Sequence, residues 1–114
     1  MRFFRAERVS SLIREKLSWI IVKEIEVPGA LITLTEVEVD KDLGRAAIKF
    51  SVVPSEKAPE AFKVLERNTG RLQHLLMEKI NIKPMPRIVF EIDRGPEKAA
   101  EVEKAFLKDN NIEQ

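Results

Sequence analysis

The chain of 114 residues contains no cysteine and no tyrosine, and it has one tryptophan and one histidine. Without cysteine it forms no disulfide and offers no thiolate ligand to a metal. No apolar run approaches the ~20 residues that a membrane-spanning helix requires, and no apolar signal-peptide core follows the start Met1–Arg5. The simplest expectation is a cytoplasmic protein.

The residues needed for catalysis are also scarce. The single histidine, His74, has no imidazole partner for a metal site and is the only possible histidine base for a serine nucleophile. The four glycines form neither a dinucleotide-binding fingerprint nor a Walker A loop. We therefore expect no enzymatic activity, no cofactor and no metal, with His74 partly buried or at the surface.

The formal net charge of +1 conceals an uneven distribution of charge along the chain. Residues 1–24 and residues 60–90 each carry six basic and three acidic side chains, whereas residues 25–59 and 91–114 are net acidic. Two basic segments that meet in space form a basic face, which is typical of nucleic-acid-binding proteins. The alternative is an ordinary solvated surface of mixed charge.

Apolar periodicity predicts a small α+β domain. Residues 4–25 have the spacing of an amphipathic helix. Residues 31–40 and 45–53 alternate as the strands of a β-hairpin, and residues 87–93 alternate as a third strand. The crossover between the second and third strands exceeds 30 residues, which is long enough for parallel pairing. In the first strand, simple alternation places on one face Leu31, Thr33, Thr35, Val37 and Val39.

The segment 59–80 has the pattern of one amphipathic helix that is interrupted at Asn68-Thr69-Gly70. Glycine costs roughly 1 kcal/mol against alanine in a helix interior, and Asn and Thr favour caps and turns. We therefore predict two helices joined by a kink, with Asn68 or Thr69 capping the second helix. The start of a helix is an anion-binding site, and an arginine flanks it on each side. An ordinary turn between two helices is the alternative.

A last helix is predicted to open at Gly95-Pro96, and a frayed polar tail is predicted at 109–114. The expected fold is a single domain over residues 1–108 with the element order α-β-β-α-kink-α-β-α. Its three-stranded sheet has helices packed on one face and a more open second face.

This order resembles that of the type II KH domain, and the sequence resembles the bacterial ribosome-binding factor A family of small-subunit assembly factors. No single residue carries the resemblance, which rests on an ordered set across most of the chain. The matching residues are Arg5, Arg8, Val9, Ile13, Leu17, Ile20 and Ile21 in the first helix, Thr33, Thr35, Val37, Val39, Asp42, Leu43 and Ala46 in the hairpin, Leu65, Gly70, Leu72 and Leu76 in the helix pair, and Pro86, Ile88, Phe90 and Asp93 in the third strand.

The resemblance implies a non-catalytic, monomeric factor that binds the small (30S) ribosomal subunit through its 16S ribosomal RNA and assists late maturation and rRNA processing. Ordinary KH domains clamp the nucleic-acid backbone with a Gly-x-x-Gly loop between two helices. Members of this family look different there, because they have an Ala-x-Gly kink. Gly70 matches the family's glycine, whereas Asn68 stands where its alanine is expected.

The candidate RNA-binding residues are therefore cations and the kink itself. Arg and Lys beside phosphate release condensed counterions. Few aromatic residues are present for base stacking, so readout of shape and backbone is favoured. The single tryptophan, Trp19, is expected in the core or at its edge rather than against a base. The candidates are Arg5, Arg8, Arg67, Asn68, Thr69, Gly70, Arg71, Lys83 and Arg87.

Other functions stay open at this point. The acidic run of the hairpin is expected to be a solvated strand face rather than a Mg²⁺ or acid–base site. A protein–protein adaptor would act through this acidic hairpin or through the open sheet face, and a small enzyme is the third class. An RNA binder needs the first helix and the kink region to share a basic face. The acidic run consists of Glu36, Glu38, Asp40 and Asp42.

Overall fold

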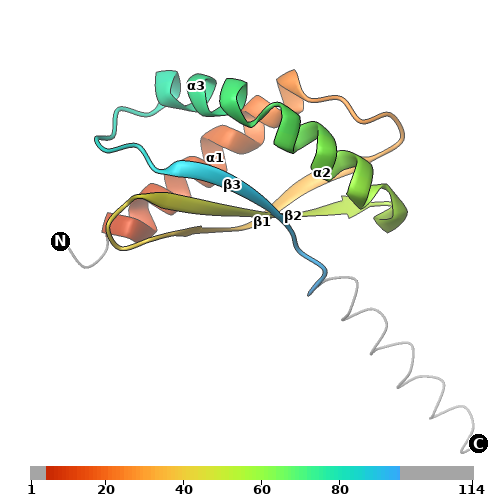
Figure 1. Ribbon diagram of the computed structural model, residues 1–114, viewed down its shortest axis with the longest axis horizontal. Coiled ribbons are helices and arrows are strands. Elements are labelled where there is room, and N and C mark those ends of the chain that lie inside the picture. Colours follow the sequence, from red (N-terminus) through yellow and green to blue (C-terminus); the bar gives the residue numbers. More distant parts are fainter. Residues whose placement is uncertain (1–4, 96–114) are drawn as a thin grey trace, which may run out of the picture.

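The computed structural model describes residues 5–95, which form three α-helices and a three-stranded sheet (Figure 1). The predicted last helix after Gly95 and the predicted tail at 109–114 lie outside the described residues. The elements are, in chain order, α1 (Arg5–Glu24), β1 (Leu31–Val39), β2 (Arg45–Val53), the 3-10 turn η2 (Ser55–Lys57), α2 (Ala58–Arg67), α3 (Thr69–Lys79) and β3 (Arg87–Ile92).

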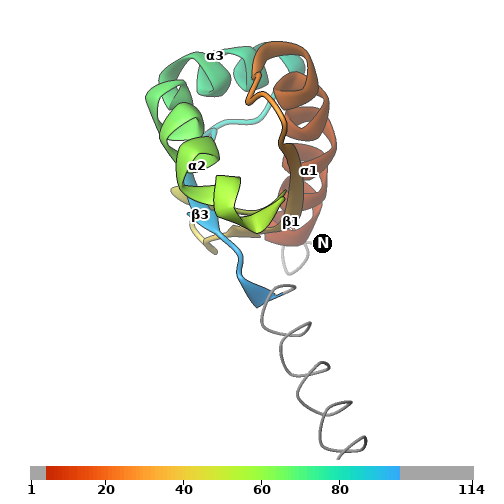
Figure 2. The same ribbon diagram turned by 90° about the vertical axis from the view of Figure 1, so that its right-hand side faces the viewer.

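The strands lie in the order β1-β2-β3, so the hairpin strand β2 is central. β1 pairs with β2 antiparallel, and β2 pairs with β3 parallel, from Arg45 opposite Arg87 to Phe50 opposite Ile92. The long crossover through α2 and α3 makes the parallel pairing possible, as predicted. All three helices cover the same face of the sheet (Figures 1 and 2). The predicted α+β architecture is therefore confirmed.

Helix α1 forms where the sequence predicts it because its apolar residues recur at helical spacing. Its five buried residues are Val9, Ile13, Leu17, Ile20 and Ile21. The helix is followed by a turn at Pro28-Gly29, where Gly29 has a φ of 76°, a conformation that glycine adopts without steric cost. No helix within residues 5–95 has the length and apolar character needed to cross a bilayer.

Strand β1 departs from the simple alternation expected for it. Its pairing with β2 shifts by one residue between Leu34 and Glu36, which makes Thr35 the extra residue of a β-bulge. As a result Leu34 and Val37 are both buried, although alternation had placed them on opposite faces. The predicted face of β1 is therefore wrong on one side of the bulge. Before the bulge the even-numbered Leu34 meets the core, whereas after it the odd-numbered Val37 does.

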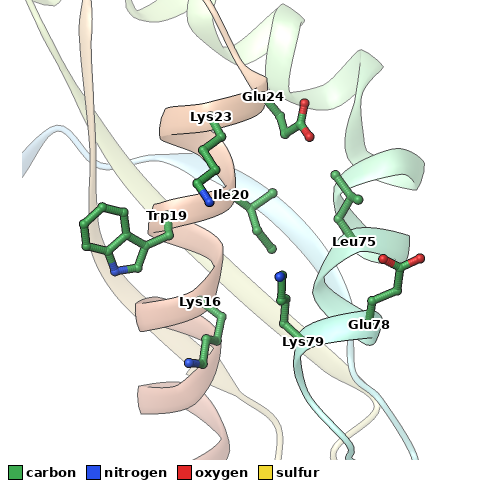
Figure 3. Close-up of a pocket in the computed structure, with 8 residues that line it drawn as sticks. All are labelled: Lys16, Trp19, Ile20, Lys23, Glu24, Leu75, Glu78 and Lys79. Atoms are coloured by element: carbon green, nitrogen blue, oxygen red, sulfur yellow. The ribbon is translucent and has the colours of Figure 1, made fainter.

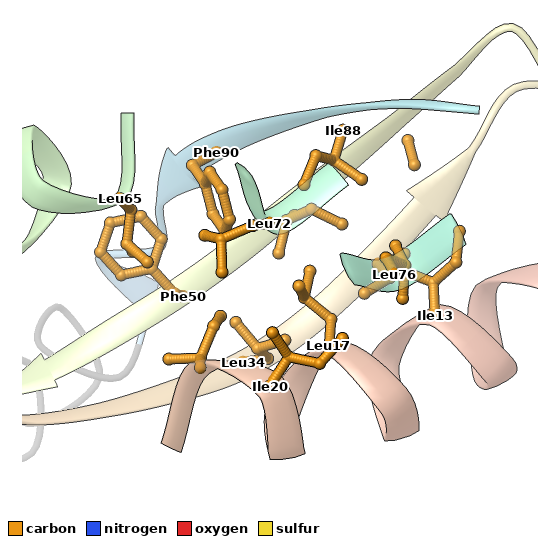
Figure 4. Close-up of a cluster of buried hydrophobic side chains, with 14 of the residues drawn as sticks. Ile13, Leu17, Ile20, Leu34, Phe50, Leu65, Leu72, Leu76, Ile88 and Phe90 are labelled. Carbon is orange, nitrogen blue, oxygen red and sulfur yellow. The ribbon is translucent and has the colours of Figure 1, made fainter. Parts of the chain in front are cut away.

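Three phenylalanines join the helices to the centre of the sheet. The ring of Phe50 on β2 lies parallel to that of Phe62 on α2, with centroids 6.4 Å apart, and meets Phe90 on β3 edge-on at 6.2 Å. Aromatic pairs of this geometry contribute about 0.5–1.5 kcal/mol beyond their burial. Leu65 and Leu72, on either side of the kink, are fully buried in the same cluster (Figure 4).

Gln73 of α3 connects this helix to the outer edge of β3. Its side-chain Nε2 donates to the carbonyl of Pro86 at 2.9 Å, and its Oε1 accepts the backbone N–H of Ile88 at 2.8 Å. The intervening N–H of Arg87 points the other way and bonds Gly44 on the β2 side. The amide of Gln73 therefore satisfies two backbone groups that an edge strand would otherwise leave unpaired.

We expect Gln73→Ala to lower the free energy of unfolding by about 1–2 kcal/mol, because both partly buried backbone groups lose their partner. Urea unfolding followed by circular dichroism measures this. His74→Ala is the matched control, since His74 is the exposed neighbour on the same helix and its side chain pairs with Glu78. Equal stability of the two variants would contradict the assigned role of Gln73.

A second polar link joins the β1 bulge to the end of β3. The hydroxyl of Thr35 donates to Asp93 Oδ2 at 2.6 Å, and the backbone N–H of Gly95 donates to Asp93 Oδ1 at 2.9 Å. These hydrogen bonds stabilise the ionised carboxylate, so the pKa of Asp93 lies below its usual value, chiefly through the Thr35 hydroxyl. Simple alternation assigns Thr35 to the same face as Val37, whereas in the structure the Thr35 hydroxyl bonds the carboxylate of Asp93.

We expect Thr35→Val to cost about 1 kcal/mol of stability at neutral pH. Asp93 has a lower pKa when folded than when unfolded, so its stabilising effect is present above the unfolded value of about 3.9 and disappears as the pH falls through the folded value. The difference from wild type should therefore shrink in acid. Thr33→Val, at an exposed threonine of the same strand, is the control in urea unfolding across pH. A deficit that is independent of pH would refute the link to Asp93.

Candidate nucleic-acid interface

The kink between α2 and α3 is a single residue, Asn68, with φ −99° and ψ 8°. Asn68 occupies the N-cap position of α3, but its side chain makes no capping hydrogen bond there, so the predicted side-chain cap is wrong. Asn68 Nδ2 instead donates to the carbonyl of Val64 at 2.8 Å, and the Thr69 hydroxyl donates to the carbonyl of Leu65 at 2.9 Å. Both side chains therefore bond carbonyls in the last turn of α2, which the backbone N–H of Asn68 also approaches at 3.1 and 3.2 Å.

Gly70 is exposed, lies in the first turn of α3 and is not required by the fold. A Cβ built on it would meet no atom within 4 Å outside its own helix, and its φ is not in the left-handed region. Glycine at such a position costs about 0.5–1 kcal/mol relative to alanine. The surface above Gly70 is therefore bare backbone that another molecule can approach closely.

We expect Gly70→Ala to raise the free energy of unfolding by about 0.5–1 kcal/mol, because a helical alanine fits without a clash and restricts the unfolded chain. Thermal and urea unfolding of the variant measure the gain. A decrease in stability would show that the kink itself needs the glycine.

Helices α1 and α3 lie side by side and antiparallel, so the two basic segments of the sequence lie next to each other (Figures 1 and 2). At one end of the pair, Arg71 of α3 forms an ion pair with Glu24 of α1. At the other end, the Arg5 guanidinium donates to the backbone carbonyl of Lys83 at 3.3 Å. Arg71 is thus directed toward α1 rather than toward the kink.

A second group of predicted residues gathers between the kink and β3. Thr69 and Arg87 line a shallow hollow of about 260 Å³ together with Glu66 and the β3 segment 88–90. Arg67, the last residue of α2, is exposed at the same end of the helix. Within residues 5–95, neither Arg67 nor Arg87 has a carboxylate within 4 Å. Neither arginine therefore forms an ion pair with the part of the chain that the structure describes, although Glu66 also lines the hollow.

The nine predicted site residues thus divide into two groups. Arg5, Arg8 and Lys83 lie at the end of the α1–α3 pair that is remote from the kink. The remaining six surround the kink, with Arg71 engaged by Glu24. The kink group consists of Arg67, Asn68, Thr69, Gly70, Arg71 and Arg87.

Trp19 is not at the core, contrary to expectation: its exposed fraction is 66%. It lies one position before the buried Ile20 and therefore about 100° around α1 from it, outside the apolar stripe. Together with Lys16 and Lys23 it lines a groove of about 410 Å³ between α1 and α3 (Figure 3). The spacing of Trp19 from Lys16 and Lys23 on one helix face was the sequence signal for this site.

The open face of the sheet carries its own ion pairs. The ammonium of Lys49 lies 3.1 Å from Glu38 and 3.6 Å from Glu36. This contact lowers the pKa of Glu38 and raises the pKa of Lys49. Within residues 5–95, no three acidic or histidine side chains converge to hold a metal ion. Two residues of the acidic run, Glu36 and Glu38, are therefore bound to a cation that the hairpin supplies itself.

The fold and the kinked helix pair define an α+β domain of the type II KH class, with a kink where ordinary KH domains have a Gly-x-x-Gly loop. The crystal structure of ribosome-binding factor A from Thermus thermophilus is similar, with a TM-score of 0.67 and 21% identity over 79% of this chain and 98% of that one. A second Thermus thermophilus structure, a ribosome binding factor A homology model fitted into the cryo-EM map of a 30S complex, has a TM-score of 0.66 and 22% identity over 79% and 96% of the chains.

Sequence comparison identifies the family. The profile of ribosome-binding factor A matches residues 5–106. Ribosome-binding factor A of Caldanaerobacter subterraneus subsp. tengcongensis is 32% identical over 95% of this chain and 90% of its own length. The protein of that name from Coxiella burnetii is 31% identical over 96% of both chains. The chain belongs to the ribosome-binding factor A family.

Proposed function

We propose that this protein is a non-enzymatic assembly factor of the bacterial cytoplasm that binds the small (30S) ribosomal subunit. It contacts 16S rRNA as a monomer and assists late subunit maturation and rRNA processing. The family membership and the 30S complex of the Thermus thermophilus protein support this function. The observation that carries it is the kink surface, which we define as Arg67, Thr69, Gly70 and Arg87.

The kink surface combines the features that phosphate contacts need. Arg67 and Arg87 are cations without an ion-pair partner within residues 5–95, and an arginine presents several N–H donors to a phosphate. Gly70 lies in the first turn of a helix and leaves room for close approach of a ribose–phosphate backbone. Such contacts read the shape and charge of an RNA backbone rather than its bases. They fix the position of the protein on folded rRNA.

The test is binding to purified small subunits over a series of salt concentrations. We expect affinity to fall steeply with salt in the wild type, because phosphate contacts release counterions. In Arg67→Glu combined with Arg87→Glu, binding should be weaker. The slope of log affinity against log salt should also be shallower, by about 1 for each phosphate that the variant no longer neutralises. Gly70→Ala should weaken binding although it stabilises the fold.

Lys41→Glu is the control for charge reversal, because Lys41 is an exposed lysine in the hairpin turn and has no ion pair within residues 5–95. It should leave both affinity and salt slope close to wild type. Circular dichroism and unfolding of each variant exclude a misfolded protein. If the wild type does not associate with free or immature subunits, the proposed function is wrong. If the wild type binds and the kink variants bind equally well, the kink surface is not the contact.

The adaptor function draws little support from the structure. Its candidate surface, the open sheet face, carries the Lys49 ion pairs and a further pair between Arg45 and Glu91 at 3.4 Å. The buried centres of protein–protein interfaces are depleted in charged residues. The open face is therefore a poor match to such an interface.

A further inference from the structure

The groove between α1 and α3 lies outside the kink surface and has its own chemistry. One wall is formed by Lys16, Trp19 and Lys23 of α1, and the other includes Leu75 and Lys79 of α3. The indole of Trp19 projects outward from α1, while Lys23 and Lys79 extend into the space between the helices (Figure 3). Trp19 is the only aromatic among the exposed large apolar side chains of the described residues, and it lies at the border of this cationic groove.

The charge balance of the groove favours an anionic occupant. Of its two carboxylates, Glu24 forms an ion pair with Arg71, and Glu78 lies 3.1 Å from His74 Nε2, a contact that is an ion pair only when the imidazole is protonated. Neither Lys23 nor Lys79 has a carboxylate within 4 Å among residues 5–95. The ammonium of Lys16 forms a long ion pair with Glu15, at 3.9 Å. The ammonium groups of Lys23 and Lys79 therefore have no ion-pair partner within residues 5–95, whereas Lys16 has one. A purely apolar protein helix docked here would leave these charges desolvated and unpaired, which is costly.

We infer that this groove binds an unpaired RNA nucleotide, with its base stacked on Trp19 and the adjoining phosphates held by Lys23 and Lys79. An exposed indole stacks on any base, because every base has a π-face, and flanking cations track the backbone. The inference rests on the proposed function and adds to it a single-stranded contact beside the kink surface. Arg5 and Arg8 extend the cationic face of α1 away from the groove, so a strand can continue along the helix.

The chain provides its own reporter for this contact. Trp19 is the only tryptophan and no tyrosine is present, so the intrinsic emission of the full chain comes from Trp19. Titration with oligoadenylate at low salt should quench and shift this emission as bases stack on the indole, and added salt should reverse the change. An emission spectrum that does not respond to oligoadenylate overturns the inference.

Substitution separates stacking from simple apolar contact. In anisotropy titrations with labelled oligoadenylate, Trp19→Ala should bind about tenfold more weakly, Trp19→Phe should retain most of the affinity, and Trp19→Leu should resemble Trp19→Ala. Val22→Ala is the matched control, because Val22 is an exposed apolar residue of the same helix with 72% exposure. Wild-type affinity in Trp19→Leu would show that the groove needs apolar surface, as for a protein partner, and would overturn the inference.

Binding to small subunits distinguishes the two proposals from each other. If wild type binds and Trp19→Ala binds about tenfold more weakly, both stand. If wild type and Trp19→Ala bind equally while the Arg67→Glu and Arg87→Glu variant fails, only the nucleotide groove is refuted. If wild type does not bind subunits but its emission still responds to oligoadenylate, the assembly function fails and the groove remains a single-strand site.

Discussion

The structure depends on the apolar contact of one bent helix pair with the central and outer strands of the sheet. A straight helix from Ala58 to Lys79 would be about 33 Å long, whereas the six residues of β3 span about 20 Å. The bend at Asn68 lets α2 and α3 both stay over the sheet, with Leu65 and Leu72 fully buried. The core therefore fixes where the kink lies, and the kink surface takes its position from the core.

The same packing explains how a nearly neutral chain presents cationic surfaces. Because α3 returns antiparallel to α1, the two basic segments lie together, while the charges of the hairpin remain on the other face of the sheet. There Lys49 and Arg45 neutralise acidic neighbours in pairs. Net charge thus says little about this molecule, and the arrangement of charge on its elements decides what it attracts.

The sequence predicted the elements well because each carries a strong apolar period: α1 by its stripe, and β2 and β3 by their alternation. It failed where a choice depends on partners distant in sequence. Asn68 has donors and acceptors that suit either a following helix or a preceding carbonyl, and only the geometry of the bend selects the carbonyl of Val64. The bulge at Thr35 is likewise set by pairing with β2 and by Asp93 across the sheet.

Only part of the candidate site could be predicted, because the sequence shows local features and not the contacts between residues distant in sequence. The kink and its flanking cations are local features that glycine and arginine indicate in one stretch of sequence. The engagement of Arg71 by Glu24 depends on the helix pair, which no local pattern reveals. Trp19 was misplaced because its neighbours Ile20 and Ile21 are buried, although a step of one residue turns a side chain by about 100°.

The two outer strands of the sheet each carry a feature that hinders self-association. β1 is bent by its bulge, and the free side of β3 is occupied at Pro86 and Ile88 by the amide of Gln73. An approaching strand from another molecule would find neither edge straight nor fully available for pairing. The bulge and the Gln73 amide thereby guard the sheet against edge-to-edge growth.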